Sequence, residues 1–87
     1  MYSVYILYSL AHGKTYTEYT SDLIQRFYSH NKFNNTDWTK NYRPWVLIHS
    51  EIFEEKAEAI NREKQLKSGV GRDWVKTNLN EWIKVFT

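Results

Sequence analysis

The chain has 87 residues, 41% of them hydrophobic and 17% aromatic, so we expect one small domain over residues 1–87 with a single core. It contains no cysteine, which excludes disulfide bonds and thiolate metal sites. Without a basic, apolar leader or an apolar run near the roughly 20 residues that span a bilayer, we expect a cytoplasmic protein that does not enter a membrane. The formal net charge of +2 is too small to indicate nucleic-acid binding by itself.

The first 20 residues predict a β-hairpin. Residues 2–8 alternate with the period of two that is typical of a strand, and residues 14–19 are rich in threonine and tyrosine. Ala11-His12-Gly13 between them indicates a turn.

The register of this hairpin decides which side chains share a face. If Ser9 and Lys14 flank a four-residue loop, Tyr5 lies opposite Glu18. Tyr5, Tyr16 and Glu18 then project from the same face of the sheet. For a pair of tyrosines alone, half-buried packing in a strand is the alternative explanation.

Residues 22–30 predict the first helix, with Ser21 as its N-cap. Its predicted buried face consists of Leu23, Ile24 and Phe27. Arg26 and His30 are four residues apart and therefore lie on neighbouring turns at the border of that face. Taken singly, Arg26 would be solvated or ion-paired, and His30 would be a cation at the helix C-terminus. Their joint position makes a site on this border a hypothesis.

The remainder of the chain predicts a loop, a third strand and two helices. We expect a polar loop over residues 31–42 and a strand over residues 45–53. A helix over residues 55–67 should end with Gly69 as a left-handed C-cap. A final helix is expected over residues 72–86, with a break near residues 78–80.

Glu63 is the most informative polar residue of the helix over residues 55–67. Ile60 and Leu66 lie three residues to either side of it, so the carboxylate belongs to the stripe that should face the core. A carboxylate there needs a partner. A salt bridge with Arg26, a surface pair with Lys67 and a metal-ligand role all remain open.

Basic residues are concentrated in the last third of the chain. Six of them fall within residues 60–87: Arg62, Lys64, Lys67, Arg72, Lys76 and Lys84. A solvated helix face and a phosphate-binding surface are both compatible with such a cluster.

Over nearly its whole length the chain resembles the GIY-YIG nuclease family, and in particular its short single-domain bacterial branch, which is related to the N-terminal nuclease domain of the excision repair incision subunit. The matching stretches are Val4-Tyr5-Ile6-Leu7, Gly13-Lys14-Thr15-Tyr16, Tyr19-Thr20-Ser21-Asp22-Leu23, His30-Asn31, Arg43-Pro44-Trp45, Arg62-Glu63-Lys64-Gln65-Leu66-Lys67-Ser68-Gly69 and Gly71-Arg72-Asp73-Trp74. The resemblance implies an α/β (α+β) fold with a three-stranded antiparallel sheet flanked by helices. The residue patterns predict the same architecture independently.

The resemblance also implies a set of site residues. Tyr5 matches the tyrosine of the first family motif, and Tyr16 matches the first tyrosine of the second. Arg26 matches the helical arginine and His30 the residue that closes that helix. Glu63 matches the metal-binding glutamate.

The implied activity is that of a metal-dependent DNA endonuclease, in DNA repair or processing, using Mg²⁺ or alternatively Mn²⁺. Tyr5 would be the base, assisted by His30, and Tyr16 would orient the water or phosphate. Arg26 would hold the phosphate and Glu63 would ligate the metal. The residues expected to contact DNA are Lys40, Arg43, Lys67, Arg72 and Lys76. A monomer is the default expectation.

Glu18 departs from the family pattern, which has glycine at this position. The carboxylate could repel the scissile phosphate, join Glu63 on the metal, or pair with Arg26 in the absence of substrate. The alternative function is therefore a catalytically impaired module of the same fold. It would bind DNA or a protein partner through the basic C-terminal helices and exposed aromatic residues such as Trp38 or Trp45.

Overall fold

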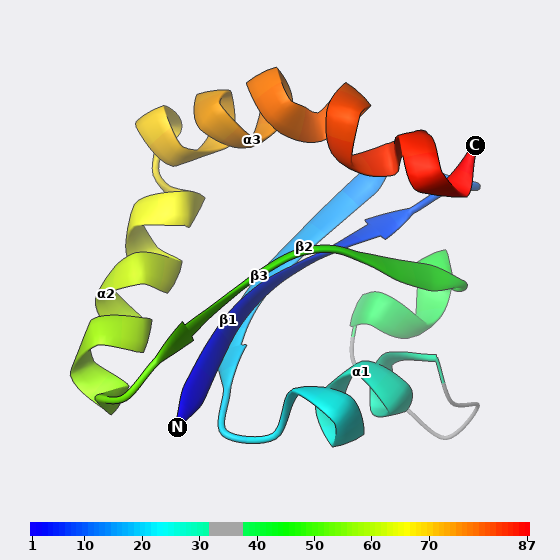
Figure 1. The fold of residues 1–87 in the computed structure, drawn as a ribbon. Helices are drawn as coiled ribbons and strands as arrows, with labels where there is room; N and C mark the ends of the chain where they lie inside the picture. The colour runs from blue at the N-terminus through cyan, green and yellow to red at the C-terminus, as the bar shows by residue number, and fades with distance from the viewer. Residues whose placement is uncertain (32–37) are drawn as a thin grey trace.

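A computed structural model provides the structure of the protein and describes residues 1–31 and 38–87. Three strands form one antiparallel sheet in the order β2-β1-β3: β1 (Tyr2–Ser9), β2 (Lys14–Thr20) and β3 (Trp45–Phe53). The helical elements are α1 (Leu23–His30), η1 (Trp38–Tyr42), α2 (Lys56–Lys67), α3 (Gly69–Ile83) and η2 (Lys84–Phe86). In Figure 1, α2 and α3 border the sheet on one side and α1 lies on the other. The predicted α+β architecture with a three-stranded antiparallel sheet is confirmed.

The β1–β2 hairpin has the predicted register. Ser9 lies opposite Lys14 and Tyr5 lies opposite Glu18. In the turn, the backbone N–H of Gly13 donates to the Ser9 carbonyl over 2.8 Å. Gly13 has a φ of 66°, which lies in the left-handed region that glycine adopts without steric cost.

The central strand β1 separates two cores. On one face, Val4 and Ile6 pack with residues of α2 and α3. On the other face, Tyr5 and Leu7 pack with Trp45 of β3 and with half-buried side chains of α1. Because alternate residues of a strand point to opposite faces, the two tyrosines of the candidate site belong to the α1 face.

The first helix begins one residue later than predicted, and a different residue caps it. Asp22, not Ser21, is the N-cap, because its carboxylate accepts a hydrogen bond from the backbone N–H of Gln25. Ile24 is 84% exposed, so its predicted burial is wrong. The inward stripe instead runs through positions 23, 27 and 30, whose spacing of four and three residues keeps them on one face.

The predicted C-cap at Gly69 is also wrong, because α3 begins at this residue. Ser68 forms the corner between α2 and α3, and its hydroxyl accepts a hydrogen bond from the backbone N–H of Gly71. The predicted break near residues 78–80 is absent, since α3 continues through them and the side chain of Asn78 donates to the carbonyl of Trp74.

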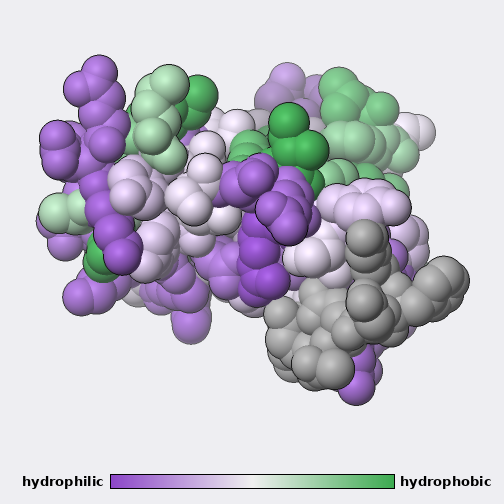
Figure 2. All heavy atoms as spheres, turned by 90° about the horizontal axis from the view of Figure 1, so that it is seen from below, coloured by the Kyte–Doolittle hydropathy of each residue, from purple (hydrophilic) through white to green (hydrophobic). Residues whose placement is uncertain are grey.

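The predicted loop over residues 31–42 ends in the short helix η1. Its residues 32–37 lie outside the described residues. In residues 1–31 and 38–87, no helix is both long and apolar enough to cross a membrane. Seen from below, the surface carries hydrophobic residues in separate patches among hydrophilic ones (Figure 2).

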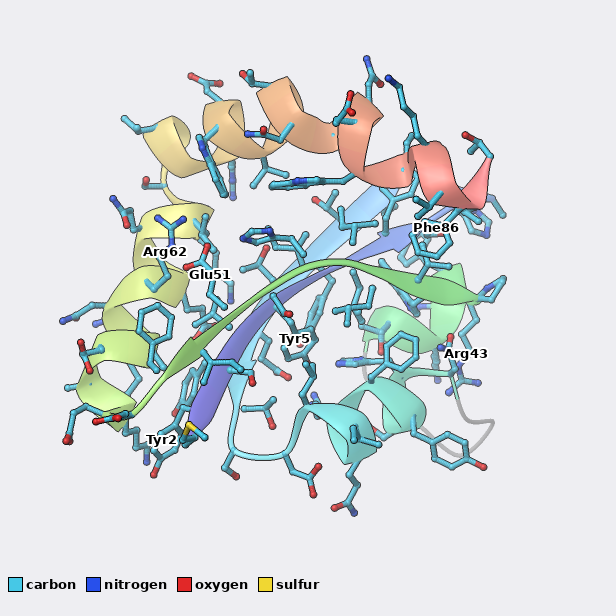
Figure 3. All side chains as sticks on the ribbon, viewed as in Figure 1. Tyr2, Tyr5, Arg43, Glu51, Arg62 and Phe86 are labelled. Atoms are coloured by element: carbon cyan, nitrogen blue, oxygen red, sulfur yellow. The ribbon has the colours of Figure 1, made fainter. Side chains whose placement is uncertain are left out.

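A polar and aromatic cluster ties β3 to α2 and α3. Arg62 donates from Nε and Nη2 to the two carboxylate oxygens of Glu51, over 2.8 and 2.9 Å, and Figure 3 shows these side chains pointing toward one another. His49 lies 2.8 Å from the same carboxylate and stacks on the ring of Trp82. The Arg62 guanidinium lies over the ring of Trp74. Contacts between residues so far apart in sequence leave no local pattern, and the sequence did not predict this cluster.

Candidate active site

Three elements bring four of the predicted site residues together. Tyr5 of β1 and Tyr16 of β2 project from the same face of the sheet, and α1 supplies Arg26 and His30. In Figure 3, Tyr5 lies between the sheet and α1. The carboxylate of Glu18 lies at the centre of this group, which we call the Glu18 cluster.

Both oxygens of Glu18 are fully engaged. Oε1 accepts hydrogen bonds from the Tyr5 hydroxyl over 2.6 Å and from Nε of Arg26 over 2.7 Å. Oε2 accepts from the Tyr16 hydroxyl over 2.9 Å and from Nη2 of Arg26 over 3.3 Å. These bonds use the roughly four lone-pair sites that a carboxylate offers. Of the three alternatives weighed for Glu18, the ion pair with Arg26 is the one present in the structure.

His30 is completely buried, so it is not the exposed helix-terminal cation considered above. Its Nε2 lies 2.8 Å from the Tyr5 hydroxyl, and its Nδ1 lies 2.9 Å from Oγ1 of Thr39. The single hydroxyl hydrogen of Tyr5 is used in the hydrogen bond that it donates to Glu18. Nε2 of His30 is therefore the donor in its hydrogen bond to the Tyr5 oxygen. The result is a directed chain of hydrogen bonds from His30 through Tyr5 to Glu18.

Thr39 is a further residue of the site that the sequence did not reveal. Its side chain is fully buried against His30, and its carbonyl accepts a hydrogen bond from Nε1 of Trp45 over 2.8 Å. It belongs to a polar stretch without periodicity, so no pattern marks it. Trp45 is buried in the core with Tyr5 and Leu7, is 2% exposed, and is therefore not available to stack on DNA bases as considered above. The side chain of Trp38 is not among those described.

Burial and the Glu18 charge set the protonation states of the cluster. Burial alone would raise the pKa of Glu18, but hydrogen bonds from Arg26, Tyr5 and Tyr16 outweigh it and hold the pKa below its ordinary value. Burial and the neighbouring carboxylate raise the pKa of Tyr16 to about 12. The same causes raise the pKa of Tyr5 well above the usual range of a phenol. Both phenols are therefore neutral at pH 7, and Arg26 and Glu18 are both charged.

Glu63 lies apart from the Glu18 cluster. Its side chain is 16% exposed and accepts a hydrogen bond from Nζ of Lys67 over 2.7 Å, which was one of the alternatives left open. The alternative salt bridge between Glu63 and Arg26 is not the one formed, since Glu63 pairs with Lys67 and Arg26 pairs with Glu18. Across the described part of the chain, Glu63 makes no hydrogen bond or ion pair with the cluster, and no group of three or more His, Cys, Asp or Glu residues could hold a metal ion.

A cavity of about 740 Å³ opens between the hairpin and the two long helices. The charged side chains among its described lining residues are all basic: Lys14, Lys67, Arg72 and Lys76. Tyr16 lines this basic cavity and its hydroxyl belongs to the Glu18 cluster, but α2 and α3, which supply the other walls of the cavity, lie on the opposite face of the sheet from α1. A volume of this size with four cations on its walls is suited to a polyanion.

Three of the five predicted DNA contacts line this basic cavity, and Lys14 joins them from the hairpin. The other two predicted contacts, Lys40 and Arg43, are not among its lining residues. Lys40 is exposed on η1. Arg43 (Figure 3) donates from Nε to the carbonyl of His30 over 2.9 Å, which ties it to the end of α1.

Comparison with known proteins adds a family and a set of relatives. The family model described as the GIY-YIG catalytic domain matches residues 1–78. A UPF0213 protein of Halobacterium salinarum is 36% identical over 67 residues, which cover 77% of this chain and 86% of that protein. A UPF0213 protein of Staphylococcus aureus is 37% identical over 65 residues, covering 75% and 78%. The solution NMR structure of a UPF0213 protein from Bacillus halodurans is similar with a TM-score of 0.53 and 29% identity, covering 88% of this chain and 84% of that one.

Proposed function

This chain belongs to the GIY-YIG family, and from that premise we propose that it is a metal-dependent endonuclease that cleaves DNA phosphodiester bonds in repair or processing. The observation that carries the proposal is the Glu18 cluster, in which two phenols and a guanidinium bind an anion. Arginine binds phosphate and carboxylate with the same bidentate geometry. The donors that hold Glu18 are thus the donors that a phosphodiester requires.

The basic cavity supports DNA as the substrate. It shares the edge strand β2 with the Glu18 cluster, and its basic side chains would bind the backbone phosphates of a DNA strand that crosses this edge. Phosphate contacts of this kind supply most of the affinity of non-specific DNA binding.

In the proposed reaction Arg26 stabilises the charge that builds on the phosphate oxygens, and Tyr16 orients the phosphate or the attacking water. Tyr5 is the candidate base. A phenol is a poor base at neutral pH, and among its neighbours the positive charge of Arg26 is the influence that lowers the Tyr5 pKa. The hydrogen bond from His30 keeps the Tyr5 oxygen in a fixed orientation.

The donor set is compatible with a hard divalent ion but does not form a complete protein site. Mg²⁺ typically keeps several waters and is held by one or two carboxylates together with substrate phosphate. Glu63 would supply one carboxylate after release from Lys67, whereas the Glu18 oxygens are already engaged by hydrogen-bond donors. When bound, Mg²⁺ or Mn²⁺ would stabilise the charge on the attacking or leaving oxygen.

A second candidate function follows from Glu18 itself. The carboxylate already occupies Nε and Nη2 of Arg26 and both phenol hydroxyls, which favours a module that binds DNA or a protein partner without cutting. Such a module would use the basic cavity alone.

Nuclease assays on branched, nicked and duplex DNA with Mg²⁺ or Mn²⁺ separate these functions. Under the leading proposal the wild-type protein cuts DNA only with metal, and Arg26→Ala abolishes cleavage. Cleavage by Glu18→Gly but not by the wild type would favour the impaired module. Absence of cleavage by both folded proteins would reject the endonuclease.

A further inference from the structure

We propose that Glu18 is the internal ligand of an oxyanion site, whose donors bind a phosphate group in exchange for the Glu18 carboxylate. This inference rests on the proposed function and adds the regulation of the same site. Substrate phosphate and Glu18 compete for Arg26. The arrangement in which Glu18 is bound to Arg26 is therefore the state of the protein without substrate.

The Glu18 carboxylate is bound by several hydrogen-bond donors that come from three different elements. Glu18 receives its hydrogen bonds from β1, β2 and α1, through Tyr5, Tyr16 and Arg26. Together these donors surround both oxygens of a single anion. A phosphodiester also presents two anionic oxygens, and arginine binds both groups side-on.

Without the Glu18 carboxylate, its hydrogen-bond donors would be left without their acceptor. Tyr5 is fully buried, and a buried donor that loses its acceptor is destabilising, the more so when a charged group such as Arg26 loses its partner as well. Removing the carboxylate alone therefore leaves a site that favours another anion. The exchange of one anion for another keeps every donor satisfied.

The Glu18–Arg26 pair is accessible to a phosphate from solution. The side chains of Glu18 and Arg26 are 23% and 34% exposed, so solvent and solutes reach the pair. The basic cavity lies along the same strand, β2, and would raise the concentration of anions near it. Glu18 lies on β2, an edge strand of the sheet, where a side chain can swing outward without disturbing the core.

Glu51 provides a matched control. It also forms a bidentate pair with an arginine, Arg62, and the side chains of that pair are both 24% exposed. Glu51 receives no phenol hydrogen bond, and neither residue lines the basic cavity. Substitution of Glu18 or of Glu51 thus removes one negative charge in either case, whereas the oxyanion site exists only around Glu18.

The test is the affinity of the protein for inorganic phosphate, measured by calorimetry at constant ionic strength. We expect Glu18→Gly to bind phosphate at least about tenfold more tightly than the wild type, which corresponds to about 1.4 kcal/mol. Glu51→Gln should bind phosphate as the wild type does. Adding Arg26→Ala to Glu18→Gly should remove the gain. Glu18→Ala, which is less disruptive in a strand, is the second variant if the glycine variant does not fold.

Equal phosphate affinity in the wild type and the folded Glu18 variants would overturn the inference. An equal gain in Glu51→Gln, or a gain that survives Arg26→Ala, would overturn it as well, since either result attributes binding to overall charge. The measurement needs no cleavage, so the two proposals fail separately. A gain in phosphate affinity in the Glu18 variants, with no DNA cleavage by the wild type or by those variants, would reject the endonuclease alone. DNA cleavage by a wild type whose Glu18 variants gain no phosphate affinity would reject the exchange alone.

Discussion

The affinity of the basic cavity for DNA should fall with increasing salt, and the number of cations that line the cavity limits how steeply. Four cations line the cavity, Lys14, Lys67, Arg72 and Lys76, so at most four phosphate contacts form there. Each contact contributes about −0.9 to the slope of log affinity against log salt for duplex DNA, giving a limit of about −3.6. Raising the salt from about 50 to 200 mM should then weaken binding by up to roughly 150-fold.

The assay is a fluorescence-anisotropy titration of labelled duplex DNA at several salt concentrations. Arg72→Ala should make the slope shallower by about 0.9 and weaken binding to all sequences alike. Lys64→Ala is the matched control, because Lys64 is exposed on the same helix as Lys67 but does not line the cavity. An unchanged slope in Arg72→Ala, or an equal change in Lys64→Ala, would show that DNA does not enter the basic cavity.

The remaining predictions concern stability. Because the pKa of Glu18 is held below its ordinary value of 4.5, its pairing stabilises the fold above that pH and is lost as the pH falls through the lower folded-state pKa. Urea unfolding between about pH 3 and 7 should therefore show a steeper acid loss for the wild type than for Glu18→Gln, and parallel curves would contradict this. Thr39→Val removes the hydroxyl bonded to His30 and should lower the free energy of unfolding by about 1–3 kcal/mol, with recovery in Thr39→Ser; equal stability of all three proteins would contradict the role of this contact. A Cβ on Gly71 would overlap the carbonyl of Gln65, so Gly71→Ala should destabilise the protein by about 1–3 kcal/mol. Gly69→Ala, which meets nothing within 4 Å, should change stability by no more than about 0.5 kcal/mol, and equal effects of both alanines would refute the packing argument.

The sheet could be predicted because its determinants are local. The turn at Gly13 and the alternation along residues 2–8 set the hairpin register, and the register in turn places Tyr5 opposite Glu18. Four of the five residues matched to the family site therefore meet in the structure. Their catalytic roles remain predictions.

The ion-pair partner of Glu63 could not be predicted from the sequence in the same way. A salt bridge with Arg26, a pair with Lys67 and a metal were all open for Glu63, and in the structure Glu63 pairs with Lys67 while Arg26 pairs with Glu18. Similarly, the choice between a C-cap at Gly69 and a new helix beginning there depends on how α3 packs onto α2. Such outcomes follow from long-range packing, which leaves no pattern in a short window of sequence.

The chemistry of the site depends on one position in β2. A glycine at position 18, as in the family motif, would leave Tyr5, Tyr16 and Arg26 facing solvent or substrate, whereas the carboxylate binds all three. The same carboxylate raises the pKa of both phenols, so it opposes the ionisation that a tyrosine base requires. A phosphate that replaced Glu18 would bring its own negative charge to the phenols, and only a cation could offset it. Arg26 supplies one such charge, and a metal ion beside Glu63 would supply another. Under the proposed function, displacement of Glu18 and binding of the metal would therefore be two separate requirements for cleavage at this site.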